Sequence, residues 1–389
     1  MSSATRRTTP LLRNKTSFAI ANGSYMAQRR RLHSMKAVVI EGSAARLDYA
    51  RRVPALRDDC ILVRPVAVAL NPTDWRHIDY RRAKDNCILG CDYAGVVEAV
   101  GRTVNKTWKR GDRIFGCAHG ANLVNPDDGV FGEFATVIGD LQMRVPESLS
   151  FEQSATLGLG SLTVGQGLFQ KSLRLDLPVV AANEVEKKNI PVLIYGGTSS
   201  TGALGIQYAK QSGYTVVTAC SPEDFGYVKS LGADFAVDYK DVEAGEKIRQ
   251  YTNNELRYAW DTISIDSSAQ ICATALTTDS SLKPIYGNLL PVQSPRKDVS
   301  TITTVMHTAF GREFMFGKVH MPASREDFEF AKTFSRITEK LLAQGRLRPH
   351  NHHVGEGGLK GVLQGLQDLK EGKVNAAKLV YRVVDTPRQ

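Results

Sequence analysis

The residues that could do chemistry are densest in one run of glycines and hydroxyl side chains. This run, YGGTSSTGALG from Tyr195 to Gly205, follows a buried-strand pattern, PVLIY, and opens a helix-like segment. Glycines allow the backbone to approach a pyrophosphate, and the first turn of a helix offers free N–H groups to an anion. The run therefore predicts a dinucleotide-binding turn. Its predicted cofactor contacts are Gly196, Gly197, Thr198, Ser199, Ser200, Thr201 and Gly202.

The next strand-like segment, TVVTAC, bears on which dinucleotide would bind. It runs into Ser221, 19 residues beyond Gly202. A site selective for NAD places an aspartate or glutamate near this position to bind the ribose hydroxyls. Ser221 leaves room for a 2′-phosphate, so the sequence favours NADPH. Glu223 and Asp224 lie close by and favour NADH if they point inward; their alternative role is to cap the next helix from the solvent side.

The elements that must position these residues divide the chain into two kinds of structure. From about Met35 to Gly165, short strand-like runs between glycine turns predict a small β-barrel, and we expect no long helix before Phe151. From PVLIY onward, strands alternate with helices, which predicts βαβ units, a doubly wound parallel sheet and an α/β fold class. Two apolar stripes with helical spacing precede a last strand, AKLVYRVV. The stripes are Phe330, Phe334, Ile337, Leu341 and Leu359, Val362, Leu363, Leu366, Leu369.

The composition is that of an ordinary folded protein of about two domains, with 389 residues, 42% of them hydrophobic and 23% charged. The formal charge is +10, but residues 1–34 hold seven Lys or Arg and no acid, so 10 − 7 = +3 remains elsewhere. A nucleic-acid binder carries its positive charge on the folded domain, so we exclude nucleic acid as a partner. The uncharged stretch Gln153–Gln170 is rich in Gly, Ser and Thr, so we expect no membrane span. The six cysteines form no CxxC pair and are expected to be buried free thiols.

Residues 1–34 form a leader that is rich in Arg, Ser and Thr and free of acids, as in a mitochondrial transit peptide. The alternative is that the folded protein starts at Met35 and that the leader is disordered or mis-assigned. Both interpretations exclude the leader from the fold. We expect a cytoplasmic protein, with the mitochondrial matrix as the alternative if the leader is a true targeting signal.

Several motifs resemble the medium-chain dehydrogenase/reductase superfamily. They are the glycine turn, Asn71-Pro72-Thr73-Asp74, Gly90-Cys91-Asp92-Tyr93-Ala94-Gly95 and Gly111-Asp112-Arg113, in a barrel-first chain order. The resemblance implies a GroES-like β-barrel catalytic domain over residues 35–165 and 320–389. It implies a Rossmann-type NADP-binding domain over residues 166–319.

The zinc alcohol dehydrogenases of that superfamily hold their metal with a Cys, a His-Glu pair and a second Cys. Here Asn71 stands in place of the first Cys, Cys91-Asp92 replaces His-Glu, and the segment Gly158–Gly165 contains no Cys. A catalytic zinc needs three protein ligands, so we predict no metal at this position and interpret Cys91 as a packed thiol. The reaction would then be one that a reduced nicotinamide performs without a Lewis acid.

Longer segments resemble the trans-acting enoyl reductases of fungal polyketide biosynthesis, the group that includes lovastatin enoyl reductase and the ToxD-like proteins. The segments are NPTDWR, GCDYAGVVEAVG, GALGIQYAKQSGYTVVTACSPED, NNELRYAWDTIS, GRLRPHNHHV and AAKLVYRV. The resemblance implies NADPH-dependent reduction of the α,β-double bond of an acyl thioester. The substrate would be bound to the carrier protein of a polyketide synthase, including synthase–peptide synthetase hybrids. The sequence departs from the group at Glu223-Asp224, where relatives usually carry a basic or amide residue, and in its leader.

The resemblance also assigns residues to the cofactor and the substrate. Outside the glycine turn, the cofactor residues would be Thr73, Asp74, Trp75, Arg76, Ser221, Pro222, Glu223, Asp224, Tyr239, Leu289, Leu290, Lys378, Leu379 and Val380. The substrate channel would be lined by Leu157, Gly158, Leu159, Gly160, Ser161, Leu162, Thr163, Val164, Thr308, Ala309, Phe310, Gly311 and Arg312.

Individual side chains suggest roles within those sets. Arg76 is the candidate for cationic stabilisation near the nicotinamide or the thioester; its alternatives are a structural or a phosphate-pairing arginine. The hydroxyls of Ser161 and Thr163 suit a carbonyl or amide contact, and Thr163 is the second catalytic candidate. His350, His352 and His353 could form a metal tract, but we interpret them as solvated side chains of a turn.

Other functions stay open on the sequence alone. They are a stand-alone quinone or enal reductase, a mitochondrial enoyl thioester reductase, and a non-catalytic NADPH-binding protein. A Ser-His-Asp hydrolase is not supported, because no G-x-S-x-G elbow occurs. The oligomeric state, monomer or homodimer, is not decided by the sequence.

Overall fold

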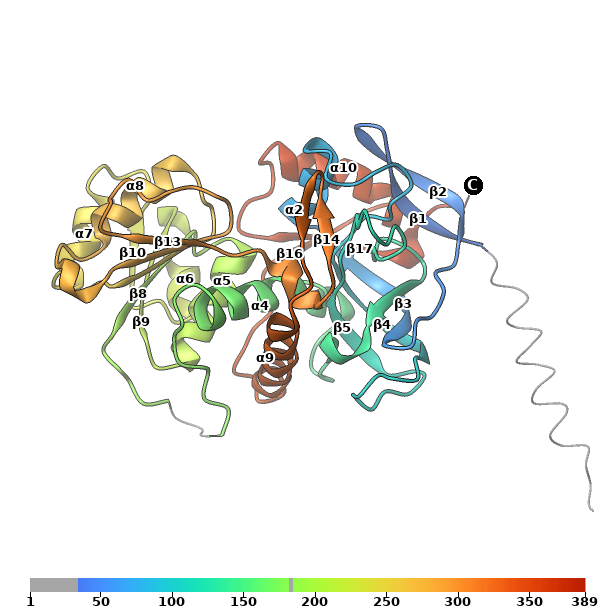
Figure 1. The fold of residues 1–389 in the computed structure, drawn as a ribbon, viewed down its shortest axis with the longest axis horizontal. Coiled ribbons are helices and arrows are strands. Elements are labelled where there is room, and N and C mark those ends of the chain that lie inside the picture. Colours follow the sequence, from blue (N-terminus) through green and yellow to red (C-terminus); the bar gives the residue numbers. More distant parts are fainter. Residues whose placement is uncertain (1–33, 182–184, 389) are drawn as a thin grey trace, which may run out of the picture.

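The computed structural model describes residues 34–181 and 185–388. They form two lobes, one around a barrel-like sheet and one around a parallel sheet, with a long helix, α9 (Arg325–Ala343), beside their junction (Figure 1). Apart from Ser34, the predicted leader lies outside the described residues. Within them, no helix is long and apolar enough to cross a membrane.

The first lobe is built on a seven-stranded sheet in which neighbours pair antiparallel, except for one parallel pair at its edge. In spatial order its strands are β16 (His352–Gly355), β17 (Lys378–Arg382), β3 (Cys60–Ala69), β4 (Asp92–Val100), β5 (Arg113–Cys117) and β7 (Met143–Arg144), with β6 (Ala135–Ile138) also paired to β3. A hairpin of β1 (Ser34–Glu41) and β2 (Ala44–Arg52) packs beside it. Strands β16 and β17, late in the chain, thus complete the sheet that β3 to β7 begin.

A short helix, α2 (Pro72–Asp79), follows β3 directly, inside the region where we expected short strands and no long helix. Asn71 and Asp74 form its capping box, and Pro72 occupies its first turn, where no backbone N–H is needed. Two helical turns are too few to produce a recognisable apolar period, which explains why the sequence analysis missed it. One of the two cap residues, Asp74, is among those that the resemblance had placed near the cofactor.

The second lobe contains the predicted parallel sheet. Its strand order is β10-β9-β8-β11-β12-β13, and every pair is parallel. Strands β8, β9 and β10 follow one another towards one edge of the sheet, and β11, β12 and β13 follow one another towards the other edge. The switch point of the doubly wound sheet therefore lies between β8 and β11. The strands are β8 (Pro191–Tyr195), β9 (Thr215–Cys220), β10 (Phe235–Asp238), β11 (Tyr258–Asp261), β12 (Ile285–Asn288) and β13 (Ser300–Thr303). The connecting helices are α5 (Ser200–Gln211), α6 (Phe225–Ser230), α7 (Ala244–Tyr251) and α8 (Asp266–Ala275).

The remaining elements join the lobes. The uncharged stretch forms α3 (Phe151–Ser154), α4 (Gly158–Val164) and a π-helical turn, η2 (Gly165–Gln170). After β13 come a short helix, η5 (Met306–Phe310), and a hairpin of β14 (Phe314–Phe316) and β15 (Val319–Met321). Both predicted apolar stripes pack into the cores, on α9 and on α10 (Gly358–Lys370). Further short helical turns are η1 (Gly139–Leu141), η3 (Pro222–Asp224), η4 (Ser280–Leu282) and η6 (Val383–Asp385).

Candidate functional site

The glycine turn lies at the carboxyl end of β8, where the strand order reverses. Gly196 has φ +79°, and Ser199 is the N-cap of α5, its Oγ accepting the Gly202 N–H at 2.9 Å. A Cβ on Gly197 would lie 2.2 Å from Thr218 Oγ1, and one on Gly202 would lie 2.2 Å from the Gly196 carbonyl oxygen. Only glycine fits these positions. The strand–turn–helix context is the one that a pyrophosphate-binding turn requires.

Other predicted cofactor residues follow neighbouring strands at the same edge of the sheet. Ser221 comes directly after β9, Tyr239 after β10, and Leu289 and Leu290 after β12. The structure therefore brings these segments together with the glycine turn, although they are distant in sequence. Thr198, Ser200 and Thr201 are half-buried, so their side chains remain accessible, whereas Ser199 is occupied by its capping bond and by the Thr262 hydroxyl at 2.9 Å.

Glu223 and Asp224 lie on η3, next to Ser221. Asp224 takes the N-cap position of α6 without a side-chain hydrogen bond there, so the structure does not show the capping role considered above. Burial, and then the charge of Glu223, raise the pKa of Asp224. Lys240 supplies a nearby cation, with its Nζ 5.7 Å from the centre of the Tyr239 ring. The segments next to Ser221 thus contain two acidic residues, Glu223 and Asp224, and one basic residue, Lys240.

A buried ion pair occupies the place where the zinc enzymes carry ligands. Lys378 Nζ contacts Asp92 Oδ2, and the two side chains are 3% and 0% exposed. Asn71 Nδ2 donates to the same oxygen at 3.0 Å, and the Leu159 N–H donates to Asp92 Oδ1 at 2.6 Å. The carboxylate is therefore held by groups of the protein itself, and it fixes the start of α4 to β4 and β17. The resemblance assigned Lys378 to the cofactor, but in the structure its ammonium group is paired with Asp92.

Asp74 and Cys91 lie beside the pair and are both fully buried. Burial, opposed by the Asn71 N–H that donates to Oδ2 at 2.7 Å, raises the pKa of Asp74 to about 7. Burial, followed by the charge of Asp74, raises the pKa of the Cys91 thiol well above its usual value. Burial therefore disfavours the thiolate form in which cysteine binds metals. The geometry agrees with the interpretation of Cys91 as a packed thiol, and all six cysteines are buried and free as predicted.

Arg76, the first catalytic candidate, is half-buried on α2. Its guanidinium carbon lies 5.2 Å from the centre of the Trp75 ring, and burial lowers its pKa. No carboxylate within the described ranges forms an ion pair with it, and its Nε is buried without a hydrogen-bond partner. A cation that is desolvated and unpaired is available to an anionic group of a ligand.

Thr163 and Ser161, both on α4, differ in burial and in hydrogen bonding. Thr163 is half-buried, and its hydroxyl donates to the Leu159 carbonyl at 2.8 Å. Ser161 is fully buried and accepts a hydrogen bond from the Tyr208 hydroxyl at 3.1 Å. Ser161 therefore contributes to the packing between α4 and α5, and the carbonyl contact of its hydroxyl stays a prediction. Leu159 and Thr163, one helical turn apart, form the accessible face of this helix.

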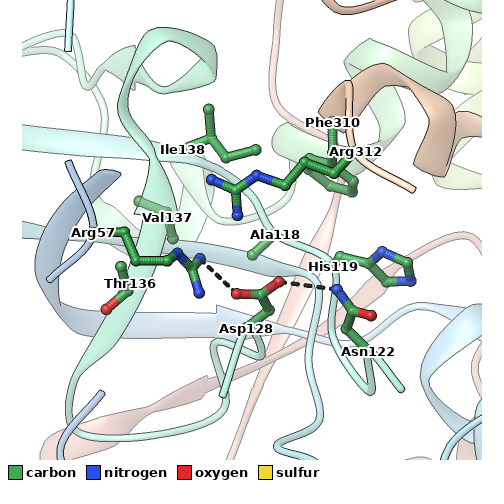
Figure 2. Close-up of a pocket in the computed structure, with 10 residues that line it drawn as sticks. All are labelled: Arg57, Ala118, His119, Asn122, Asp128, Thr136, Val137, Ile138, Phe310 and Arg312. Atoms are coloured by element: carbon green, nitrogen blue, oxygen red, sulfur yellow. Dashed lines mark hydrogen bonds and ion pairs between the residues drawn. The ribbon is translucent and has the colours of Figure 1, made fainter. Parts of the chain in front are cut away.

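The second substrate segment lies on η5 and the residues after it. Thr308, Ala309 and Phe310 are buried, and Arg312 forms an ion pair with Asp59 at 2.6 Å. Phe310 and Arg312 line a small cavity of about 20 Å³, shared with an Arg57–Asp128 ion pair (Figure 2). A cavity of this size holds about one water molecule and no acyl chain. The described side chains therefore leave the predicted channel closed at this point.

The histidines differ from the sequence interpretation. His350 is 3% exposed, its Nδ1 lies 3.0 Å from the Tyr227 hydroxyl, and burial lowers its pKa to about 4. The prediction of a solvated side chain is wrong for His350, because the turn folds back against α6; His353 is exposed and His352 half-buried. The sequence analysis also missed three other histidines, His77, His119 and His307, which the fold brings together. No spacing in the sequence signals their proximity.

Comparisons with known proteins match both lobes. Family models match residues 57–147, described as "Alcohol dehydrogenase GroES-like domain", and residues 201–288, described as "Zinc-binding dehydrogenase". A mycobacterial protein solved in complex with NADPH has the same fold, with TM-score 0.66 and 20% identity over 90% of this chain and 100% of that chain. The predicted combination of a Rossmann-type sheet with a GroES-like domain is confirmed.

Curated fungal proteins are similar over most of their length. The trans-enoyl reductase resD of Aspergillus sclerotiorum is 43% identical over 355 residues, which are 88% of this chain and 98% of the relative. The trans-enoyl reductase TOXD of Cochliobolus carbonum is 50% identical over 280 residues, 72% of this chain and 91% of the relative. With this similarity spread over both sheets and the glycine turn, the chain belongs to the fungal trans-enoyl reductases of the medium-chain dehydrogenase/reductase superfamily.

Proposed function

We propose that the protein is an NADPH-dependent enoyl reductase that acts on a polyketide thioester bound to a carrier protein. The observation that carries the proposal is the glycine turn between β8 and α5, at the carboxyl edge of the parallel sheet. The turn offers the N-terminus of a 12-residue helix, glycines that admit no Cβ, and accessible hydroxyls on both sides of the cap. These are the features that fit a dinucleotide pyrophosphate.

Bound NADPH would supply the hydride for the β-carbon of the conjugated double bond, and a proton would then be delivered to the α-carbon. The protein has to hold the thioester in line with the nicotinamide and stabilise the negative charge that develops on the thioester oxygen. Arg76 is our candidate for that stabilisation, because its cation is half-buried and has no carboxylate partner within the described part of the chain. Thr163 is the second candidate, because its half-buried hydroxyl on α4 could turn towards the substrate from the Leu159 carbonyl, to which it donates at 2.8 Å.

We further propose that this chemistry needs no metal at the position of the zinc alcohol dehydrogenases. Asp92 is saturated by Lys378, Asn71 and the Leu159 N–H, and the ammonium of Lys378 stands where a cation would have to bind. The neighbouring Cys91 stays a thiol. Polarisation of the substrate carbonyl would then fall to side chains such as Arg76.

The decisive experiment compares NADPH oxidation with three substrates: an enoyl thioester on a carrier protein, the same acyl group on coenzyme A, and a quinone. We expect the carrier-bound thioester to have the highest kcat/KM. Preference for the quinone would identify a stand-alone quinone reductase, and the absence of turnover with all three would favour a non-catalytic NADPH-binding protein. Arg76→Gln should lower kcat on the thioester more than it changes the Kd for NADPH, with the exposed Arg81→Gln as the matched control.

The cellular site belongs to the same proposal. Enzymes that act on synthase-bound chains need access to the synthase, so we place the protein in the cytoplasm. A fusion of the leader residues to a fluorescent reporter distinguishes a cytoplasmic location from the mitochondrial matrix.

A further inference from the structure

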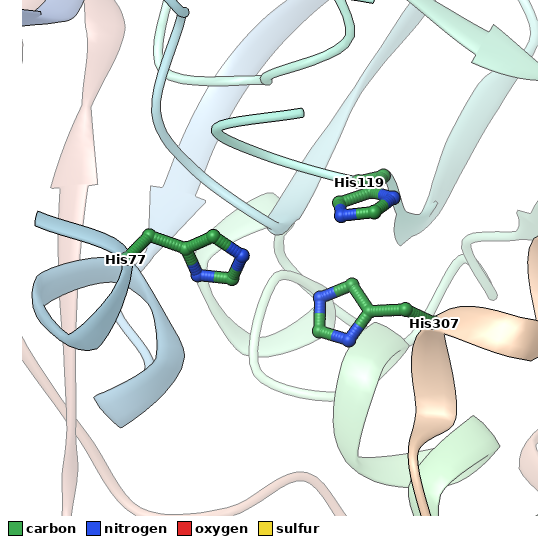
Figure 3. A group of neighbouring side chains, drawn as sticks. All are labelled: His77, His119 and His307. Carbon is green, nitrogen blue, oxygen red and sulfur yellow. The ribbon is translucent and has the colours of Figure 1, made fainter. Parts of the chain in front are cut away.

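Three buried histidines meet between the two lobes. His77 comes from α2, His119 from the loop after β5, and His307 from η5, and they are 1%, 6% and 6% exposed. One ring nitrogen from each lies within 4.8 Å of the others. The ring centres are 6.2, 5.6 and 4.5 Å apart, and Figure 3 shows the three rings facing a common space.

The hydrogen bonding of this histidine cluster is incomplete. The Nε2 atoms of all three residues are buried and have no hydrogen-bond partner within the described residues. His77 Nδ1 lies 2.7 Å from the Thr73 carbonyl oxygen, which can only accept, so Nδ1 carries the proton and Nε2 presents a lone pair. Three unsatisfied polar atoms in one buried cluster are unusual for a folded protein, because each is costly to leave without a partner.

The cluster is also chemically suited to a transition-metal cation. Imidazole is the commonest ligand for such ions in proteins, and it binds them in its neutral form. A carbonyl that accepts from the far nitrogen of a ligating histidine, as Thr73 does here, is the usual partner that orients the ring.

We propose that His77, His119 and His307 bind one divalent transition-metal ion, with zinc as the best match, and that water completes the coordination. Three imidazoles and an open fourth position are a known zinc arrangement, with Zn–N distances of about 2.1 Å. Tetrahedral ligands at that distance lie about 3.4 Å apart, so ring nitrogens at the present limit of 4.8 Å must approach one another by about 1.4 Å.

The surroundings define what kind of site this would be. Phe310, Phe314 and Phe316 pack around the rings, and Arg82 lies 4.8 Å from the centre of the Phe316 ring. The positive charge of Arg82 would oppose a bound cation. We therefore expect the water that completes the coordination to lose a proton and to bind as hydroxide. His119 also lines the small cavity of Figure 2, which has room for about one water molecule.

None of the three histidines is among the residues that the resemblance aligns with the superfamily's zinc ligands, which are Asn71, Cys91-Asp92 and a residue of Gly158–Gly165. Its ligands connect α2 and the β5 loop of the barrel lobe with η5, the segment that follows the last strand of the parallel sheet. A metal here would fasten η5 to the barrel lobe as a structural clip. The inference does not depend on the proposed reductase activity, because none of its measurements involves turnover.

The test uses the full chain, stripped of metal by chelation and titrated with Zn²⁺ by calorimetry and with Co²⁺ by absorption. We expect one equivalent to bind, with the visible absorption of four-coordinate Co²⁺ and without a thiolate charge-transfer band. His119→Gln and His307→Phe should each weaken binding at least tenfold, while His353→Gln, at an exposed histidine, should bind like wild type. Zn²⁺ should raise the Tm of wild type and of His353→Gln only.

His307→Phe keeps an aromatic ring against Phe314 and Phe316, so it is the variant expected to fold normally. Binding below one equivalent at micromolar metal would overturn the proposal. So would equal affinity in wild type and His307→Phe, or a thiolate band, since both place the metal elsewhere. In those cases a buried water that bridges the Nε2 atoms is the remaining explanation for the cluster.

Discussion

Lys378 and Asp92 come from β17 and β4, which are 286 residues apart in the chain, yet their charged groups are almost fully buried together. A buried charge is tolerated when a partner and further hydrogen bonds compensate for its lost hydration. Asp92 has all of these, since Asn71 and the Leu159 N–H complete its bonds. Removing one partner leaves the charge of the other buried without a counter-charge, so we expect a large loss of stability.

Lys378→Met should destabilise the fold by about 3–5 kcal/mol, because the Asp92 carboxylate would remain buried without its cation. The double variant Lys378→Met/Asp92→Asn should recover part of that loss. Unfolding free energies from denaturant titration measure both, with Lys373→Met at an exposed lysine as the control. A loss below about 1 kcal/mol in Lys378→Met would show that the pair is hydrated in solution.

Asp74 makes a prediction about pH. Its pKa is raised in the folded protein to about 7, from 3.8, so between these values the folded state binds one more proton than the unfolded state. Its contribution to stability is therefore complete below about pH 4 and is lost as the pH rises to about 7, by an amount of the order of 4 kcal/mol. Asp74→Asn keeps an oxygen for the Asn71 N–H. The stability difference between wild type and variant should fall over that pH window, and a flat difference would contradict the burial argument.

Ser221 decides the choice of cofactor in our proposal. A charge-assisted hydrogen bond to a 2′-phosphate is worth roughly 1.5–3 kcal/mol, and a carboxylate at this position would repel that phosphate. Ser221→Asp should raise the KM for NADPH at least tenfold, about 1.4 kcal/mol, and leave NADH equal or better. Steady-state kinetics with both cofactors check this, with Ser281→Asp as an exposed control. Because Glu223 and Asp224 lie close, wild-type use of NADH as well as NADPH would show that the phosphate is placed wrongly.

At the scale of elements, the sequence predicted the parallel sheet better than the barrel lobe. The glycine turn and the alternation of strands with helices are local signals, and both are confirmed. The helix α2 was missed because eight residues carry too short a period. The histidine cluster and the Lys378–Asp92 pair could not be predicted either, since they depend on contacts between segments far apart in the chain.

The glycine turn offers a matched pair of substitutions. Gly202→Ala would place a Cβ 2.2 Å from the Gly196 carbonyl oxygen, so the turn would have to open. We expect the Kd for NADPH to rise at least tenfold. Gly226→Ala, in α6, meets no atom within 4 Å and should be neutral or slightly stabilising. Fluorescence titration with NADPH measures both; equal affinities would mean that the cofactor does not depend on this turn.

At the scale of the whole molecule, the described fold begins with β1 at Ser34, next to the predicted boundary. Deleting residues 1–33 should therefore leave the Kd for NADPH and the turnover within about twofold of the full chain. A fusion of these residues to a fluorescent reporter tests the targeting hypothesis. Diffuse cytosolic signal would end the transit-peptide interpretation, and mitochondrial signal would contradict the cytoplasmic location.

The pairing of β17 with β3 has a consequence for synthesis on the ribosome. Translation delivers all six strands of the parallel sheet before residue 352, where the closing strands of the barrel sheet begin. Domains generally fold as units once their residues have emerged. The nucleotide lobe can therefore form while β3 still has an unpaired edge, which is a hazard for aggregation until β17 arrives. Nascent chains stalled just before residue 352, when β13 has left the ribosome and β17 is not yet made, should thus engage chaperones through the barrel half, while the half that follows it in the sequence is already compact.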